Sequence, residues 1–114
     1  MHQAGVVSYL EEHYADTIRL DDLTAKAHMS RSTLLRAFKL AFGHSPIDYL
    51  IRLRVDRAAD MLRNTDWDLS RIAFNCGFSD SNYLSRQFRS ITGMSPRTFR
   101  HRFASNTGDP PSGS

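Results

Sequence analysis

The sequence predicts an all-α fold: two helix-turn-helix subdomains joined by a long linker helix, with about seven helices in all. Three observations lead to this prediction. Apolar residues recur at helical spacing along most of the chain, a pattern of about 50 residues occurs twice, and Ser, Asp, Gly and Pro stand where helices would begin and end. No segment alternates convincingly between apolar and polar residues, so we expect no strand.

Composition is that of one small globular domain. The chain has 114 residues, of which 40% are hydrophobic and 24% charged. No run approaches 18 apolar residues and the N-terminus lacks the pattern of a secretion signal, so we expect neither a membrane contact nor export. The single cysteine, Cys76, excludes an internal disulfide and fits a reducing compartment, so we expect a cytoplasmic protein.

Charge is unevenly distributed along the chain. Residues 1–24 carry a net charge of −4 within a total of +3, which leaves +7 for the remainder. Residues 81–103 contain no acid and five arginines: Arg86, Arg89, Arg97, Arg100 and Arg102. Such a basic region favours a polyanionic partner, although a basic stripe is also common on ordinary solvated surfaces.

An internal repeat is the strongest signal. The stretch from Leu20, LDDLTAKAHMSRSTLLRAFKLAFGHSPIDYL, resembles the stretch from Leu69, LSRIAFNCGFSDSNYLSRQFRSITGMSPRTFR. Apolar, capping and glycine positions match at an offset of 49 up to Ser30, and at an offset of 50 from Leu34 onward. Two copies are too few for a solenoid, so we interpret the repeat as a duplicated unit.

Each unit is expected to form two helices around a tight turn. In the first unit, about residues 5–44, Ser30 caps a helix that Gly43 ends. In the second, about residues 68–103, Asp68 caps one helix, Gly77 makes the turn, and Ser79 or Asp80 caps the next, which ends at Gly93. The predicted inward-facing residues of these helices are Leu20, Leu23, Ala27, Leu34, Ala37, Phe38 and Ala41, then Leu69, Ile72, Cys76, Leu84, Phe88 and Ile91.

Three further helices complete the predicted domain, residues 1–103. One precedes the first unit and carries Val6 and Leu10. The linker helix opens with Ser45 as N-cap and Pro46 at its first position and runs over about residues 46–64. A short closing helix holds Pro96, Phe99 and Phe103, and residues 104–114 are expected to be a disordered tail.

A short turn between two helices, present twice, is the pattern of a DNA-reading element. The second helix of such a unit fits the major groove, where Arg pairs with guanine, Asn with adenine, and Leu contacts a thymine methyl. We therefore predict contacts with double-stranded DNA from ten outward-facing residues. These are Arg31, Ser32, Leu35, Arg36 and Lys39 in the first unit, and Ser81, Asn82, Ser85, Arg86 and Arg89 in the second.

The linker helix bears on the kind of DNA site. Its length of roughly 27 Å, together with the width of the flanking units, suits major grooves that lie about 34 Å apart on one side of the duplex. Because one chain carries two readers of different sequence, the site should be asymmetric and bipartite.

The residues at this point resemble the DNA-binding domain of the AraC/XylS family of bacterial transcription regulators. The resemblance covers residues 5–103 and is most specific in IAFNCGFSDSNYLSRQFRSITGMSPRTFR, residues 72–100; the linker stretch RVDRAADML is also similar. It implies a bent DNA site read by Ser32, Leu35 and Arg36 and by Ser81, Asn82, Ser85 and Arg86. It also implies regulation of transcription, with activation through contact with RNA polymerase as the usual output.

Most members of that family carry a separate effector-binding or dimerisation domain on the N-terminal side. No such segment is present in these 114 residues, so we expect an excised C-terminal domain, although some members consist of this domain alone.

Two functions other than DNA binding fit the sequence less well. A protein-interaction module that had lost DNA binding would have uncharged reading positions, against which Arg36, Arg86 and Arg89 argue. An enzyme that repairs alkylated DNA would need a zinc-bound cysteine cluster, which Cys76 alone cannot supply. We therefore expect no enzymatic activity, no catalytic residue, no cofactor and no metal; Cys76 is predicted to be buried and Arg54 to have a structural role.

Overall fold

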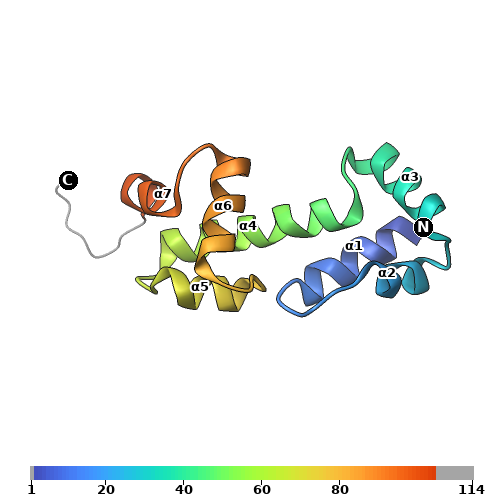
Figure 1. Cartoon of the computed structure of the whole chain (residues 1–114), viewed down its shortest axis with the longest axis horizontal. Coiled ribbons are helices and arrows are strands. Elements are labelled where there is room, and N and C mark those ends of the chain that lie inside the picture. Colours follow the sequence, from blue (N-terminus) through green and yellow to red (C-terminus); the bar gives the residue numbers. More distant parts are fainter. Residues whose placement is uncertain (1, 105–114) are drawn as a thin grey trace. The chain divides into compact units, whose positions relative to one another are not determined.

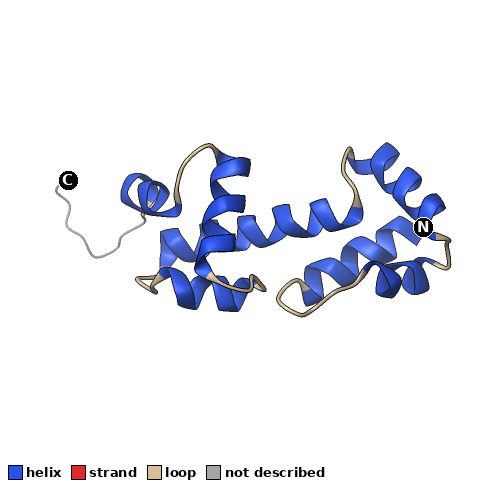
Figure 2. Cartoon of the chain, in the orientation of Figure 1, coloured by secondary structure: helices blue, strands red, loops and turns tan. Residues whose placement is uncertain are grey.

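The computed structural model describes residues 2–104, with side chains from Gly5 onward, and the secondary structure of this part consists of helices joined by loops, without a strand (Figures 1 and 2). The expected seven helices are confirmed. The predicted tail lies outside the described residues, apart from Ala104. The helices are α1 (His2–His13), α2 (Leu20–Ala27), α3 (Arg31–Phe42), α4 (Pro46–Asn64), α5 (Leu69–Cys76), α6 (Ser81–Thr92) and α7 (Pro96–Phe103).

Two compact units divide the chain within α4, unit 1 being Met1–Leu53 and unit 2 Arg54–Ser114. The helix itself is continuous across this boundary over 19 residues, or about 28 Å at 1.5 Å per residue. The first part of α4 therefore belongs to unit 1 and the second part to unit 2. None of the described helices is long and apolar enough to cross a membrane.

Unit 1 has its own core, assembled from the first four helices. The buried residues are Val6, Leu10, Leu23, Ala27, Leu34, Phe38 and Leu50, with Ile47 and Tyr49 among the half-buried side chains that pack against them. The Phe38 ring meets Tyr49 edge-on, with ring centroids 5.5 Å apart. Burying these side chains together is what holds α3 on the rest of unit 1.

Unit 2 repeats the arrangement with α5, α6 and α7 on the second part of α4. Leu84 and Phe88 of α6 are fully buried, as are Ile72 and Cys76 of α5. The Phe88 ring packs edge-on against Phe99 of α7 with centroids 5.3 Å apart. Phe88 thus occupies in unit 2 the place that Phe38 holds in unit 1.

Polar caps define where the helices begin. The side chains of Ser30, Asp68, Asp80 and Ser95 each accept a hydrogen bond from the backbone N–H three residues on, and Ser45 does the same for α4. Of the two candidates for α6, Asp80 is the cap. At α2 the direction differs, because the Asp22 carboxylate accepts from the backbone N–H of Arg19 at 2.9 Å.

The predicted apolar stripe of α3 is wrong at one position. Ala41 is exposed, although it lies seven residues after the buried Leu34, while Ala37 is half-buried. In this last turn of α3 the Phe42 ring packs against Phe38 and Tyr49, with centroids 4.6 and 5.5 Å apart, so Phe42 rather than Ala41 continues the apolar face.

Left-handed residues end four of the helices. Gly43, Gly77 and Gly93 have φ of 79°, 92° and 85°, and His28 at the end of α2 has φ 57°. In an L-residue this conformation brings Cβ close to the following carbonyl oxygen, a clash that glycine avoids. His28 is the only non-glycine residue with positive φ in the described part of the chain.

Replacing Gly43 or Gly93 with alanine should therefore lower the free energy of unfolding by about 1 kcal/mol. A Cβ at either position would meet no atom within 4 Å, so the loss comes from the backbone alone. Gly5→Ala is the matched control, since Gly5 is within α1 and its Cβ would also lie in open space. This control should be stabilising by about 0.5–1 kcal/mol. Urea unfolding measures the change in the free energy of unfolding, and a change of the same sign in all three variants would contradict the prediction.

Arg100 stabilises the end of α4 from a distant part of the chain. Its Nε donates to the Leu62 carbonyl at 3.1 Å and a terminal N–H donates to the Thr65 carbonyl at 3.0 Å. The last carbonyls of a helix have no partner within the helix, and the α4 dipole favours a cation there.

Candidate nucleic-acid interface

The second helix of each unit presents a polar face to solvent. On α3 the residues Arg31, Ser32, Leu35, Arg36 and Lys39 are all exposed, opposite the buried Leu34 and Phe38. Ser32, Leu35, Arg36 and Lys39 follow at i, i+3, i+4 and i+7, so they share one face of the helix. This face combines two cations with a hydroxyl and one apolar side chain.

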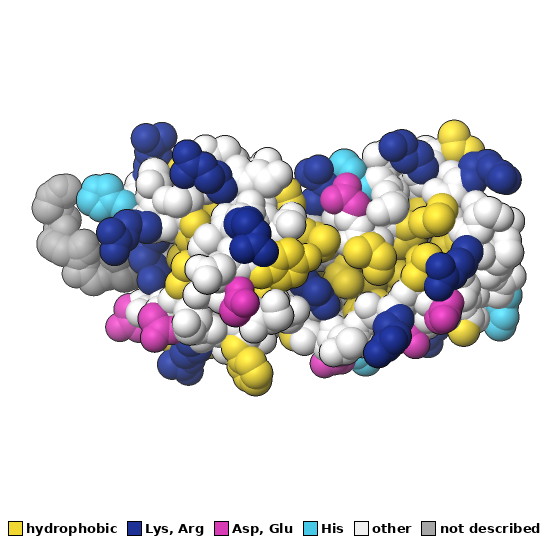
Figure 3. Space-filling model, in the orientation of Figure 1, with side chains coloured by type: hydrophobic (Ala, Val, Ile, Leu, Met, Phe, Trp, Pro, Cys, Tyr) yellow, Lys and Arg dark blue, Asp and Glu magenta, His cyan; other side chains and the backbone are white. Residues whose placement is uncertain are grey.

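The corresponding face of α6 is similar in charge. Asn82, Arg86 and Arg89 are exposed, while Ser81 and Ser85 are half-buried. The structure thus places all ten predicted residues on α3 or α6, five on each. Lys and Arg side chains stand out on the visible surface of both units (Figure 3).

Two of the cations are positioned by neighbours that sequence reasoning did not single out. Arg31 forms an ion pair with Asp21 in the first turn of α2, at 3.2 Å, and both side chains are well exposed. The Arg86 guanidinium lies over the Tyr83 ring, 5.7 Å from its centroid. The position equivalent to Tyr83 in α3 is Thr33, so Arg36 has no aromatic ring there. Spacing alone could have suggested the Tyr83–Arg86 contact, which is an i, i+3 pair on a helix.

The buried groups behind α6 do not resemble a reactive site. Cys76 is fully buried and its thiol lies 3.6 Å from the Met61 sulfur. Burial raises the pKa of the Cys76 thiol to about 11, so it stays protonated near neutral pH. Burial also lowers the pKa of Arg54, against the smaller opposing effects of Tyr83 and Cys76. Cys76 is therefore a small core residue, as predicted.

Potential metal ligands are also scattered. Among the described residues, no three or more His, Cys, Asp or Glu side chains form a group that could hold a metal ion.

An exposed Arg-bearing helix that follows a tight turn, present once in each of two units, defines a helix-turn-helix DNA-binding domain. Comparison with known families agrees: the family model described as "Helix-turn-helix domain" matches residues 23–112. Its family is that of the AraC-type regulators, and the chain belongs to it.

Individual relatives support the same assignment. The chain is 39% identical over 95 residues to the HTH-type transcriptional activator RhaS of Escherichia fergusonii; the match covers 83% of this chain and 34% of that protein. The chain thus spans about a third of the length of this relative. This relative is named as a transcriptional activator.

Solved structures also share the fold. The DNA-binding domain of AdpA, a global transcriptional factor crystallised with a target DNA, has 34% identity and a TM-score of 0.83, over 88% of this chain and 90% of that one. A regulator from Chromobacterium violaceum with an AraC-type DNA-binding domain has 29% identity and a TM-score of 0.84, over 93% and 95%.

Proposed function

We propose that the chain binds double-stranded DNA sequence-specifically by inserting α3 and α6 into two successive major grooves, and that it regulates bacterial transcription in this way. The observation that carries the proposal is the pair of exposed faces, each with arginine and hydrogen-bonding side chains. Helix N-termini add backbone N–H donors suited to phosphate. The relative AdpA binds a target DNA through its own domain of this fold.

The ten residues divide into two expected roles. Arg36, Arg86, Asn82 and Leu35 have side chains suited to base edges or to a thymine methyl. Arg31, Lys39 and Arg89 are suited to phosphates, and Ser32, Ser81 and Ser85 to either. Arg31 would have to leave Asp21 before it bound DNA, at small cost, because exposed ion pairs contribute about 1 kcal/mol or less.

Selection from a random DNA library tests the proposal most directly. We expect one non-palindromic motif with two parts, about 16–20 base pairs long, because two different readers would lie about one helical turn apart on the DNA. A palindromic motif, or a single short half-site, would contradict the assignment of both α3 and α6 as readers.

Affinity for the selected site should fall steeply with salt. Each phosphate that a Lys or Arg neutralises releases counterions, so the three phosphate contacts assigned to Arg31, Lys39 and Arg89 would give a slope of roughly −2.7 in a plot of log K against log salt concentration. Fluorescence anisotropy of labelled DNA between 50 and 250 mM salt measures this slope. A flat response would count against an interface built from Arg31, Arg36, Lys39, Arg86 and Arg89.

Regulation is proposed to act through RNA polymerase, most simply as activation. The relative RhaS is named a transcriptional activator. In a transcription reaction with purified bacterial RNA polymerase and a promoter carrying the selected site upstream, the chain should raise transcript yield. A fall in yield would instead support repression by the same DNA contacts.

A further inference from the structure

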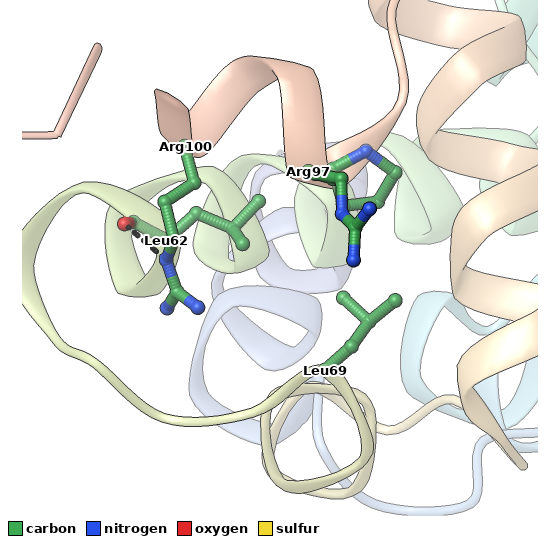
Figure 4. Close-up of a pocket in the computed structure, with 5 residues that line it drawn as sticks. Leu62, Leu69, Arg97 and Arg100 are labelled. Atoms are coloured by element: carbon green, nitrogen blue, oxygen red, sulfur yellow. Dashed lines mark hydrogen bonds between the residues drawn. The ribbon is translucent and has the colours of Figure 1, made fainter. Parts of the chain in front are cut away.

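A pocket of about 320 Å³ lies in unit 2 where the end of α4 meets the starts of α5 and α7 (Figure 4). Its lining is apolar on one side and cationic on the other. Figure 4 shows the Arg97 guanidinium directed toward Leu69 and the Arg100 guanidinium beside the Leu62 carbonyl. The lining residues are Leu62, Leu69, Pro96, Arg97 and Arg100.

Unit 1 fills the equivalent place with hydrocarbon. At the offset of 50, the counterparts of Arg97 and Arg100 are Ile47 and Leu50. Leu50 is only 2% exposed and Ile47 packs against the core of unit 1. The two copies of the repeat therefore differ in chemistry here, since unit 2 has two cations where unit 1 closes its core.

Only one of the two guanidinium groups makes hydrogen bonds within the described part of the protein. Arg100 is half-buried and its hydrogen bonds go to the carbonyls that end α4. Arg97 is exposed, and its side chain makes no hydrogen bond or ion pair with the described residues. Asp60 pairs with Arg63, and the Asp68 side chain caps α5. Arg97 thus offers a positive charge that has no ion-pair partner among the described residues.

We propose that this pocket binds a small carboxylate with an apolar body, such as a single ring or a short branched chain. The carboxylate would pair with the Arg97 guanidinium, which suits two-point recognition of a planar anion. The apolar body would lie mainly against Leu69, because Leu62 is only 2% exposed and Pro96 is buried. The volume is at the lower end of small-molecule pockets, which favours a ligand of this size over a long lipid or a protein segment.

Titration of the whole chain with benzoate, followed by backbone NMR signals, tests the proposal. We expect saturable shifts centred on the start of α7, the end of α4 and the start of α5. Benzamide lacks the charge and acetate lacks the ring, so both should bind at least about tenfold more weakly than benzoate. This experiment contains no DNA, so its outcome is independent of the proposed DNA-binding function.

Matched variants locate the site. Arg97→Gln should weaken benzoate binding at least about tenfold. Arg102→Gln, an equal change of charge at an exposed position on the same helix, should leave it unchanged. Arg97→Lys keeps the charge without the planar fork and should be intermediate.

Three outcomes would overturn the proposal. One is that acetate or inorganic phosphate binds as well as benzoate, which would make Arg97 a general anion contact of the kind that serves DNA phosphates. The second is that Arg102→Gln weakens benzoate as much as Arg97→Gln does. The third is that no saturable shift occurs in the native chain. For each variant, an unchanged unfolding midpoint would show that the protein is folded.

Discussion

Truncating Phe88 to alanine should lower the free energy of unfolding of unit 2 by about 3–5 kcal/mol. Phe88 is fully buried and packs edge-on against Phe99, so its removal deletes apolar burial and leaves a cavity that the neighbouring helices cannot fill. A domain of this size has a total stability of about 5–15 kcal/mol, so the loss would bring unit 2 close to unfolding at ambient temperature.

The chain supplies both a reporter and a control for this experiment. Trp67 is the only tryptophan, lies in unit 2 half-buried with the Arg71 guanidinium 3.9 Å from its ring centre, and reports on this unit by fluorescence. Phe74→Ala makes the same substitution on α5 at a side chain that is 80% exposed, and should change stability by no more than about 0.5 kcal/mol. Similar losses in the two variants would mean that the assigned core is wrong.

Arg86→Ala should weaken binding to the selected DNA site by about 1–3 kcal/mol, a factor of roughly five to a hundred or more. The side chain is exposed on α6, and the Tyr83 ring beneath its guanidinium limits the freedom that it would lose on binding a base. Arg36 has Thr33 in place of this ring, so Arg36→Ala is expected to cost less.

The comparison with random DNA decides what Arg86 contacts. If it reads a base, binding to random duplexes should fall far less than binding to the selected site. An equal loss on both would show a phosphate contact only. Lys26→Ala, which removes an exposed cation of α2 that stacks on Tyr9, serves as a charge control and should leave the ratio of the two affinities unchanged.

Helical spacing, caps and glycines predicted the seven helices because these signals are local. Ser30, Ser45 and Asp68 cap the helices that the sequence assigned to them, and Gly43, Gly77 and Gly93 take the predicted left-handed conformation. Ala41 shows where local reasoning fails. Its position on the helix predicts burial, but burial requires a covering element, and that depends on tertiary packing.

For the candidate interface, too, the sequence predicted the local features and not the contacts between distant residues. The repeat predicted which residues of α3 and α6 share a face, and the structure leaves the Arg and Lys side chains among them exposed. The repeat could not predict that Asp21 pairs with Arg31, ten residues away on another helix. Nor could it predict that Arg100, which counted only toward a basic region, donates to carbonyls 35 and 38 residues earlier in the chain.

The position of Arg100 near the end of the described residues has a practical consequence for protein engineering. A gene shortened to stop before Pro96 would still encode α3 and α6, yet its product would lose the Phe99 ring that packs on Phe88 and leave the Leu62 and Thr65 carbonyls without these donors. Fusions and truncations should therefore keep the protein through Phe103, and a tag is better attached beyond that residue.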